Sequence, residues 1–268
     1  MDVANARSSL IKYYPLKKVG SLYHTFLNVW RQMSRRKRKR HLRNRNKNRK
    51  YKSWGPKEEL KVLEAKSKNQ EIYIDAIYNS DITFCSGPAG SGKTAIAVGV
   101  ASEYILDEEI EKLVITRPVV ESGKGLGHLP GTLVDKIKPY LVPLIEEMHL
   151  YIGRDKVRDM RYQNLIELCP LEYMRGRNFH DTFMVLDEAQ NATFEQIKMF
   201  LTRIGQGSKA VINGDISQTD LPTDCAGGLI TCVDKLAEIE GVSICTLGDE
   251  DIVRNTIIGE ILTQLKGS

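Results

Sequence analysis

Residues 87–94 read G-P-A-G-S-G-K-T and fit the pattern G-x-x-x-x-G-K-[ST] at every defining position. An apolar run at 82–85 comes directly before this stretch, and a helical pattern at 95–104 comes directly after it. A strand, a glycine-rich loop and a helix in this order create an anion site, because loop N–H groups and the helix N-terminus face the same point. The alternative, a glycine-rich turn without a ligand, does not explain why both flanks match. The stretch therefore predicts a phosphate-binding loop.

The side chains of this loop have separate expected roles in binding ATP. Lys93 places a positive charge near the β- and γ-phosphates, and the hydroxyl of Thr94 is a ligand for Mg²⁺. The nucleotide-contacting residues expected from the motif are Gly87, Pro88, Ala89, Gly90, Ser91, Gly92, Lys93, Thr94 and Ala95. The sequence thus predicts ATP and Mg²⁺ as cofactors.

An acidic pair follows an uninterrupted apolar segment at 183–186, which reads as a buried strand. Ligands of open parallel sheets bind at the carboxyl ends of the strands, where this pair falls. We expect Asp187 to hold Mg²⁺ together with Thr94, and Glu188 to orient and deprotonate the attacking water.

Two glutamines have amides that suit a nucleotide. Gln218 follows the apolar strand at 209–212, and we expect it to hydrogen-bond the γ-phosphate or the attacking water; a turn glutamine is the alternative. Gln70 lies shortly before the first strand, and its amide can donate to and accept from an adenine edge.

The charge is distributed very unevenly along the chain. Residues 35–52 contain 12 Lys or Arg and no acid, whereas the other residues hold 27 basic and 34 acidic side chains. The basic block is a solvated tail, a nuclear-import signal or a nucleic-acid arm, and we favour the arm because it concentrates the positive charge. Before it, 21–33 predicts an amphipathic helix that docks on the protein or lies on a membrane surface.

Short apolar strands alternate with helices from about residue 57 onward, which predicts an α/β fold with a parallel sheet covered on both faces. We divide the chain into an N-terminal extension at 1–54 and a P-loop ATPase domain at 55–268. No apolar run is long enough to span a membrane, no signal-peptide core is present, and five scattered cysteines suit a reducing compartment. A cytoplasmic location is expected.

Further motifs follow the phosphate loop in a fixed order. They are ITRPVVESGKGLGHLPG (115–131), PLEYMRGRNF (170–179), FMVLDEAQNAT (183–193), MFLTRIGQGSKAVINGDISQTDLP (199–222) and DIVRN (251–255). Together they resemble the PhoH family of ATPases from about residue 57 to 266, and that family is similar to the first RecA-like domain of superfamily 1 helicases. The resemblance implies ATP hydrolysis, association with RNA, ring-shaped oligomers such as a hexamer, and an adenine-contacting role for Gln70. Lys124 departs from the pattern, because the family usually has an acid there.

Arginines form the second set of candidate residues. Arg203 and Arg254 are candidates for an arginine finger that acts on a neighbouring subunit's nucleotide, with a surface salt bridge as the alternative. Guanidinium groups also suit the phosphates of nucleic acid. The residues assigned to nucleic acid are Arg117, Lys124, Arg175, Arg177, Arg35, Arg36, Lys37, Arg38, Lys39 and Arg40.

Three functions fit these features. The leading interpretation is an ATPase acting on RNA or single-stranded DNA as an oligomeric helicase or remodeller. The second is an ATP-dependent assembly switch that recruits a nuclease or ribosomal factor without moving along a strand. A small-molecule kinase is the third and weakest, since it has no use for the DEAQ and GDISQ motifs or the basic arm.

Overall fold

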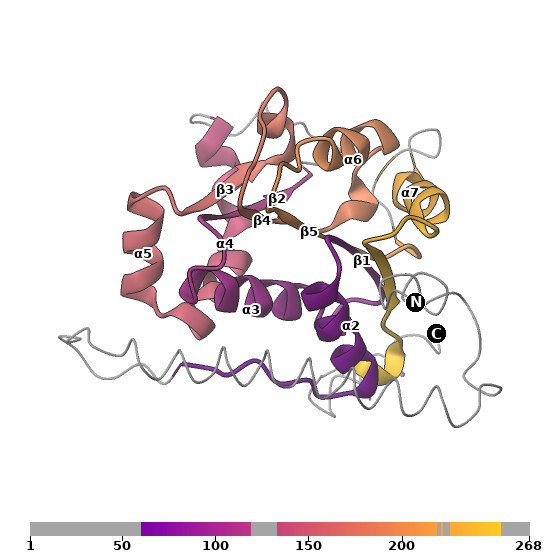
Figure 1. Cartoon of the computed structure of the whole chain (residues 1–268), viewed down its shortest axis with the longest axis horizontal. Helices are drawn as coiled ribbons and strands as arrows, with labels where there is room; N and C mark the ends of the chain where they lie inside the picture. The colour runs from indigo at the N-terminus through magenta and orange to yellow at the C-terminus, as the bar shows by residue number, and fades with distance from the viewer. Residues whose placement is uncertain (1–59, 119–132, 219–220, 222–225, 253–268) are drawn as a thin grey trace, which may run out of the picture.

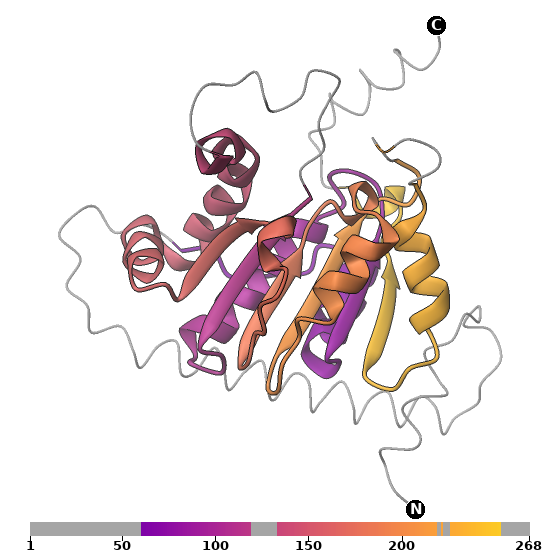
Figure 2. The same cartoon turned by 90° about the horizontal axis from the view of Figure 1, so that it is seen from above.

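The computed structural model describes residues 60–118, 133–218, 221 and 226–252. Within them, six strands form one parallel sheet in the order β3-β2-β4-β5-β1-β6 (Figures 1 and 2). The strands are β1 (Ile82–Ser86), β2 (Lys112–Arg117), β3 (Ile166–Pro170), β4 (Thr182–Leu186), β5 (Lys209–Gly214) and β6 (Val242–Thr246). Because they all run in one direction, their carboxyl ends lie along one edge of the sheet, which is where parallel sheets bind ligands.

Helices cover both faces of this sheet (Figure 1). On one face lie α2 (Lys68–Asn79), α3 (Lys93–Leu106), α4 (Leu133–Ile152) and α5 (Arg154–Tyr162). On the other face lie α6 (Phe194–Leu201) and α7 (Gly228–Leu236). The predicted α/β fold with a doubly covered parallel sheet is confirmed.

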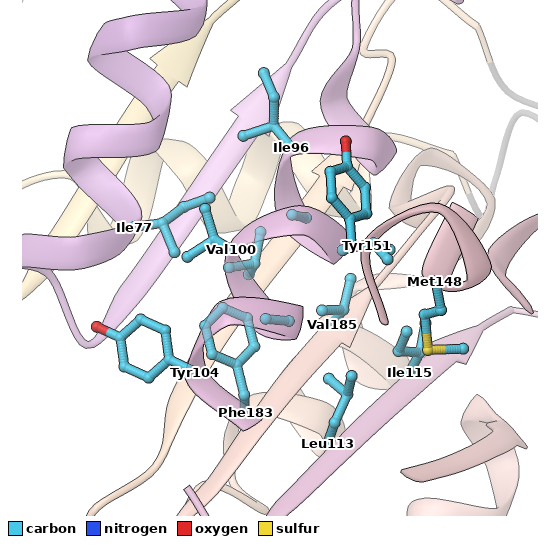
Figure 3. Packing of buried hydrophobic residues seen from close by; sticks show 14 of the residues in the cluster. Ile77, Ile96, Val100, Tyr104, Leu113, Ile115, Met148, Tyr151, Phe183 and Val185 are labelled. Atoms are coloured by element: carbon cyan, nitrogen blue, oxygen red, sulfur yellow. The ribbon is translucent and has the colours of Figure 1, made fainter. Parts of the chain in front are cut away.

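The central strand β4 is buried along its whole length. Phe183 and Val185 pack on the face covered by α3, and Figure 3 shows them with Val100 and Tyr104 of that helix. The intervening Met184 and Leu186 pack on the opposite face, toward α6. An uninterrupted apolar sequence is therefore required here, because both faces of the strand meet apolar side chains.

The sequence pattern predicts a strand at 242–246 and a helix at 132–152 around two prolines, and both are confirmed as β6 and α4. The pattern at 57–79 predicts helices interrupted near 67–69, and the part before the interruption is wrong, because residues 60–67 form no helix. Ser67 instead begins α2 as its N-cap, with its side-chain oxygen accepting a 3.1 Å hydrogen bond from the backbone N–H of Gln70. Helix α5 and strand β3 occupy a stretch for which the sequence predicted only mixed structure.

Several predictions fall outside the described residues. They are the extension at 1–54 with Arg35, Arg36, Lys37, Arg38, Lys39 and Arg40, the loop residue Lys124, the candidate finger Arg254, and most of the helix expected at 250–266. Among the helices that are described, none is both long enough and apolar enough to cross a membrane.

Candidate functional site

The loop between β1 and α3 has the tight geometry that the sequence predicted. Gly92 begins α3 with a φ of +93°, a conformation that residues with a Cβ rarely adopt. Gly87 is required for a different reason, since a Cβ there would lie 2.7 Å from the carbonyl oxygen of Leu247. Both glycines therefore fix the path of the backbone as it enters the helix N-terminus.

Lys93 and Ser91 fold back onto this loop. The Lys93 ammonium donates to the carbonyl oxygens of Gly87 at 2.5 Å and Pro88 at 2.9 Å. The Ser91 hydroxyl donates to the same Pro88 oxygen at 2.8 Å. The Lys93 ammonium therefore lies within the loop, where phosphate oxygens can replace the carbonyl oxygens as its hydrogen-bond acceptors.

Thr94 and Asp187 lie 93 residues apart in sequence but meet at the carboxyl edge of the sheet. The Thr94 hydroxyl donates to Asp187 Oδ1 at 2.8 Å, and Asp187 is only 2% exposed. Mg²⁺ binds oxygen ligands and is usually held by one or two carboxylates together with phosphates and water. This hydroxyl–carboxylate pair supplies oxygen atoms of the kind that Mg²⁺ binds, and the described residues contain no group of three or more His, Cys, Asp or Glu side chains placed to hold a metal ion.

Buried polar atoms that have no hydrogen-bond partner within the described part of the chain gather at the strands on both sides of Asp187. They are Thr116 Oγ1 and Arg117 Nε at the end of β2, and Asn213 Nδ2 and Asp215 Oδ2 at the end of β5. Buried polar atoms normally have partners in the protein or in bound water or ions. Their position at the ligand-binding edge of the sheet agrees with a hydrated metal and phosphate site.

Glu188, directly after Asp187, has a φ of 57° and a side chain that is 44% exposed. The left-handed conformation turns the chain between β4 and the short helix η3 (Ala189–Asn191), which separates the directions of the two carboxylates. One is buried beside Thr94, and the other is open to solvent. This separation suits a metal ligand next to a base that must reach water.

Gln190, which no sequence signal marked as a site residue, joins two parts of the site. Its Nε2 donates to Glu188 Oε2 at 2.6 Å, and its Oε1 accepts from the backbone N–H of Asp215 at 3.0 Å. Gly214 permits this approach, because a Cβ there would lie 3.0 Å from the Gln190 oxygen. Gln218, three residues after Asp215, is exposed and donates its backbone N–H to the Asp215 carbonyl at 3.1 Å.

Gln70 lies under the phosphate loop, only 3% exposed. Its Nε2 donates to the Ser91 carbonyl at 2.9 Å and to the Asp251 carbonyl at 3.3 Å, and its Oε1 accepts from the Lys66 N–H at 2.8 Å. In this arrangement the amide joins α2 to the loop. Its adenine contact stays a prediction and requires these hydrogen bonds to rearrange.

Asp251, in the short helix η4 (Asp249–Asp251), fixes the neighbouring segment against α2. Its carboxylate accepts from the Ser67 hydroxyl, from Asn69 Nδ2 at 3.0 Å and from the Gly248 N–H at 2.7 Å. Burial alone would raise the pKa of Asp251, but these hydrogen bonds together hold that pKa below its ordinary value. Asp251, the first residue of the DIVRN motif, thus anchors η4 against α2.

The arginines predicted to contact nucleic acid lie in different environments. Arg117 lies in the site itself, where Nη2 donates to Asp187 Oδ2 at 2.6 Å. Arg177 forms a two-pronged ion pair with Glu167 at 2.5 and 2.8 Å and stacks over the Phe179 ring. Arg175 is exposed at the end of the short helix η2 (Leu171–Met174). Of the three arginines, Arg175 has the side chain that is most accessible to a nucleic-acid strand.

Arg203, the candidate finger, is half-buried and directed toward its own chain. Its guanidinium donates to the carbonyl oxygens of Arg177 at 3.1 Å and Met199 at 3.3 Å, and to the Thr202 hydroxyl at 3.2 Å. A finger role requires Arg203 to leave these partners, and it stays a prediction.

We expect Glu167→Gln to lower the free energy of unfolding by about 1–3 kcal/mol at pH 7. Hydrogen bonds from Arg177 and then Lys112 outweigh burial and lower the pKa of Glu167 to about 2. Because the pKa of Glu167 is lower in the folded protein than its ordinary value of 4.5, the ionised carboxylate adds to the free energy of unfolding at pH values above 4.5. This added stability is lost as the pH falls from 4.5 toward 2. Urea unfolding of both proteins at several pH values measures this. A stability difference that stayed constant from pH 7 to pH 3 would contradict the assignment.

The sheet, the phosphate loop and the acidic pair define the class: the chain has the fold and the phosphate-loop sequence of P-loop nucleotide-binding proteins. It belongs to the PhoH-like protein family, whose model matches residues 62–266. A PhoH-like protein of Synechocystis is 44% identical over 75% of this chain and 61% of its own length. One of Bacillus subtilis is 43% identical over 75% and 63%, and Protein PhoH of Escherichia coli is 36% identical over 72% and 55%.

The chain therefore spans about six tenths of the length of these curated relatives. Solved structures with a similar backbone include the large terminase of a thermophilic bacteriophage, which is 13% identical with a TM-score of 0.47 over 73% of this chain and 49% of that chain. The Pif1 helicase of Candida albicans is 17% identical with a TM-score of 0.40 over 76% and 44%.

Proposed function

We propose that the chain is a Mg²⁺-dependent ATPase that works on RNA or single-stranded DNA. The observation that carries the ATPase proposal is the meeting of Thr94 and Asp187 at 2.8 Å beside the phosphate loop, with Glu188 as the next residue. Calorimetric titration with ATP in Mg²⁺ tests the binding part. Phosphate release with and without single-stranded RNA tests the coupling to nucleic acid.

Each residue of the site has a defined task in this reaction. The loop N–H groups and Lys93 bind the phosphates, while Thr94 and Asp187 hold Mg²⁺, which supplies charge neutralisation on the phosphate oxygens. Glu188 accepts a proton from the attacking water. Gln190 orients that carboxylate and connects it to Asp215, so the position of the Gln218 segment is coupled to the position of the base.

Features at the carboxyl edge of the sheet support action on a nucleic acid. Arg175 and Tyr173 are both exposed at η2, which follows the end of β3. An arginine suits a phosphate and an exposed aromatic ring suits a stacked base. Among the described residues, these two exposed side chains offer the chemistry of a single-strand contact at the carboxyl edge of the sheet.

Deleting 1–54 should weaken nucleic-acid binding and flatten its salt dependence. The 12 basic residues of 35–52 neutralise phosphates, and each contact contributes a slope of about −0.9 on duplex DNA or about −0.7 on single strands in log K against log salt. ATP hydrolysis without nucleic acid should persist, because the phosphate-handling residues lie downstream. Fluorescence anisotropy at several salt concentrations measures the slope. An unchanged affinity and slope would make the arm a solvated tail.

We also propose a homo-oligomeric ring, such as a hexamer, in which Arg203 or Arg254 of one subunit completes the site of the next. A single RecA-like domain has one lobe around the nucleotide, and a neighbouring subunit supplies the other. Native mass measurement with Mg²⁺ and ATP, with and without RNA, tests the ring. A fully active monomer would overturn it.

The second function is an ATP-dependent assembly switch that recruits a nuclease or ribosome-associated factor. The Gln190 connection between Glu188 and Asp215 supports this switch as well as it supports the strand-acting ATPase, because the connection couples the nucleotide state to a surface loop. Turnover that single strands accelerate supports the strand-acting ATPase. Turnover that only a protein partner changes supports the switch. The cytoplasmic location stays a prediction.

A further inference from the structure

Arg117, the last residue of β2, reaches across to both acids of β4's carboxyl end. Its Nη2 lies 2.6 Å from Asp187 Oδ2 and 3.4 Å from Glu188 Oε1. The contact follows from the sheet order, because β2 pairs directly with β4. One guanidinium therefore compensates two adjacent carboxylates, one of which is almost completely buried. Removing a partner from a buried charge is strongly destabilising, so Arg117 stabilises this pair as long as it stays in place.

The two oxygens of Asp187 have different partners. Oδ1 accepts from the Thr94 hydroxyl at 2.8 Å, and Oδ2 accepts from Arg117 at 2.6 Å. Mg²⁺ requires octahedral ligands at about 2.0–2.1 Å, with its water molecules filling the other positions. Both oxygens of Asp187 are thus occupied, so a hydrated dication that binds this carboxylate must displace one of their partners. Like charges at such a distance also repel each other.

We propose that Arg117 neutralises the Asp187–Glu188 pair when no metal is bound and that a divalent metal displaces the Arg117 side chain. The site then exchanges one cation for another when metal and nucleotide bind. This inference rests on the proposed function, because it takes Asp187 as the metal-holding carboxylate. It also changes the role of Arg117 from a nucleic-acid contact to a residue that positions the acids.

The remaining contacts of Arg117 show which interactions are lost when a metal displaces its side chain. Its Nη1 donates to the Tyr140 carbonyl of α4 at 3.2 Å, while its Nε is buried with no hydrogen-bond partner among the residues that the structure describes. The side chain is 18% exposed, so it has a route toward solvent. Displacement of Arg117 breaks the bridge between Asp187 and α4. Metal occupancy is thereby communicated to α4 through the lost contact with Tyr140.

The test measures binding of Mn²⁺ alone, without nucleotide, by the electron paramagnetic resonance signal of the free ion. Removing the competing charge in Arg117→Met should tighten Mn²⁺ binding at least about tenfold. Arg117→Lys keeps the charge and should stay within about threefold of wild type. Arg177→Met is the matched control, because it removes an equally paired arginine at Glu167 and should leave Mn²⁺ affinity unchanged. Asp187→Asn should abolish the binding.

The outcomes separate the exchange from the function on which it rests. If Asp187→Asn abolishes Mn²⁺ binding but Arg117→Met binds Mn²⁺ as wild type does, the displacement of Arg117 is wrong. The assignment of the metal site at Asp187 then remains correct. If Asp187→Asn binds normally, the metal site itself is wrong. Nitrogen NMR of the arginine side chains gives a readout on the wild-type protein, with the Arg117 signal identified by its loss in Arg117→Lys. That signal should shift when Mg²⁺ is added, and an unmoved signal would overturn the proposal.

Discussion

Replacing Glu188 by Gln is expected to slow ATP hydrolysis by about 10²–10⁴-fold while ATP binding stays near the wild-type value. The amide keeps the size of the side chain but cannot accept a proton from the attacking water. The phosphate contacts belong to other residues, so binding is not lost. Steady-state phosphate release and calorimetric ATP binding, measured on the same preparation, separate the two effects.

Glu195→Gln is the matched control for this variant. Glu195 is an exposed residue of α6 whose side chain pairs, among the described residues, with Lys198, three residues along the same helix. Its replacement should leave turnover within about twofold, since exposed ion pairs contribute little. Wild-type hydrolysis by Glu188→Gln would show that another group is the base.

Replacing Lys93 by Ala is expected to weaken ATP binding by about 10–100-fold and to reduce turnover at least as much. The ammonium is the charged side chain placed among the loop carbonyls, and a hydrogen bond to a charged group is worth more than a neutral one. Calorimetry and phosphate release again provide the measurement.

Lys198→Ala, an exposed lysine of α6, is the control for loss of charge. Thermal unfolding of Lys93→Ala should remain cooperative, because the loop keeps its glycine geometry and the Ser91–Pro88 hydrogen bond. A folded Lys93→Ala protein with wild-type affinity for ATP would mean that the loop does not bind phosphates through this residue.

The phosphate loop and the central strands were predictable because their sequence signals are local. Glycines and a lysine at fixed spacing define the loop, and β4 is apolar throughout because both of its faces are buried. Strand β3 was missed because it lies at the sheet's edge and is only partly buried, with Glu167 near its start. Helix α5 was missed for a related reason, as it buries only Val157 and Met160.

The site contacts that escaped prediction depend on strand order. Arg117 meets Asp187 because β2 and β4 are neighbours in the sheet, although β3 lies between them in sequence. Gln190 meets Asp215 because β4 and β5 are neighbours. A sequence motif gives the residue types at each strand end, but the lateral order of the strands decides which of them touch. The arginine in ITRP was therefore assigned to nucleic acid on its charge alone.

The most direct test of the central claim is release of γ-phosphate from ATP as Mg²⁺ is titrated, for the wild-type chain and for Asp187→Asn. The site described here predicts that wild-type release depends on Mg²⁺ and saturates, that chelation of the metal stops it, and that Asp187→Asn loses it. Phosphate release that persists without Mg²⁺, or that Asp187→Asn carries out at the wild-type rate, would contradict the assignment of Thr94, Asp187 and Glu188 as the hydrolytic centre.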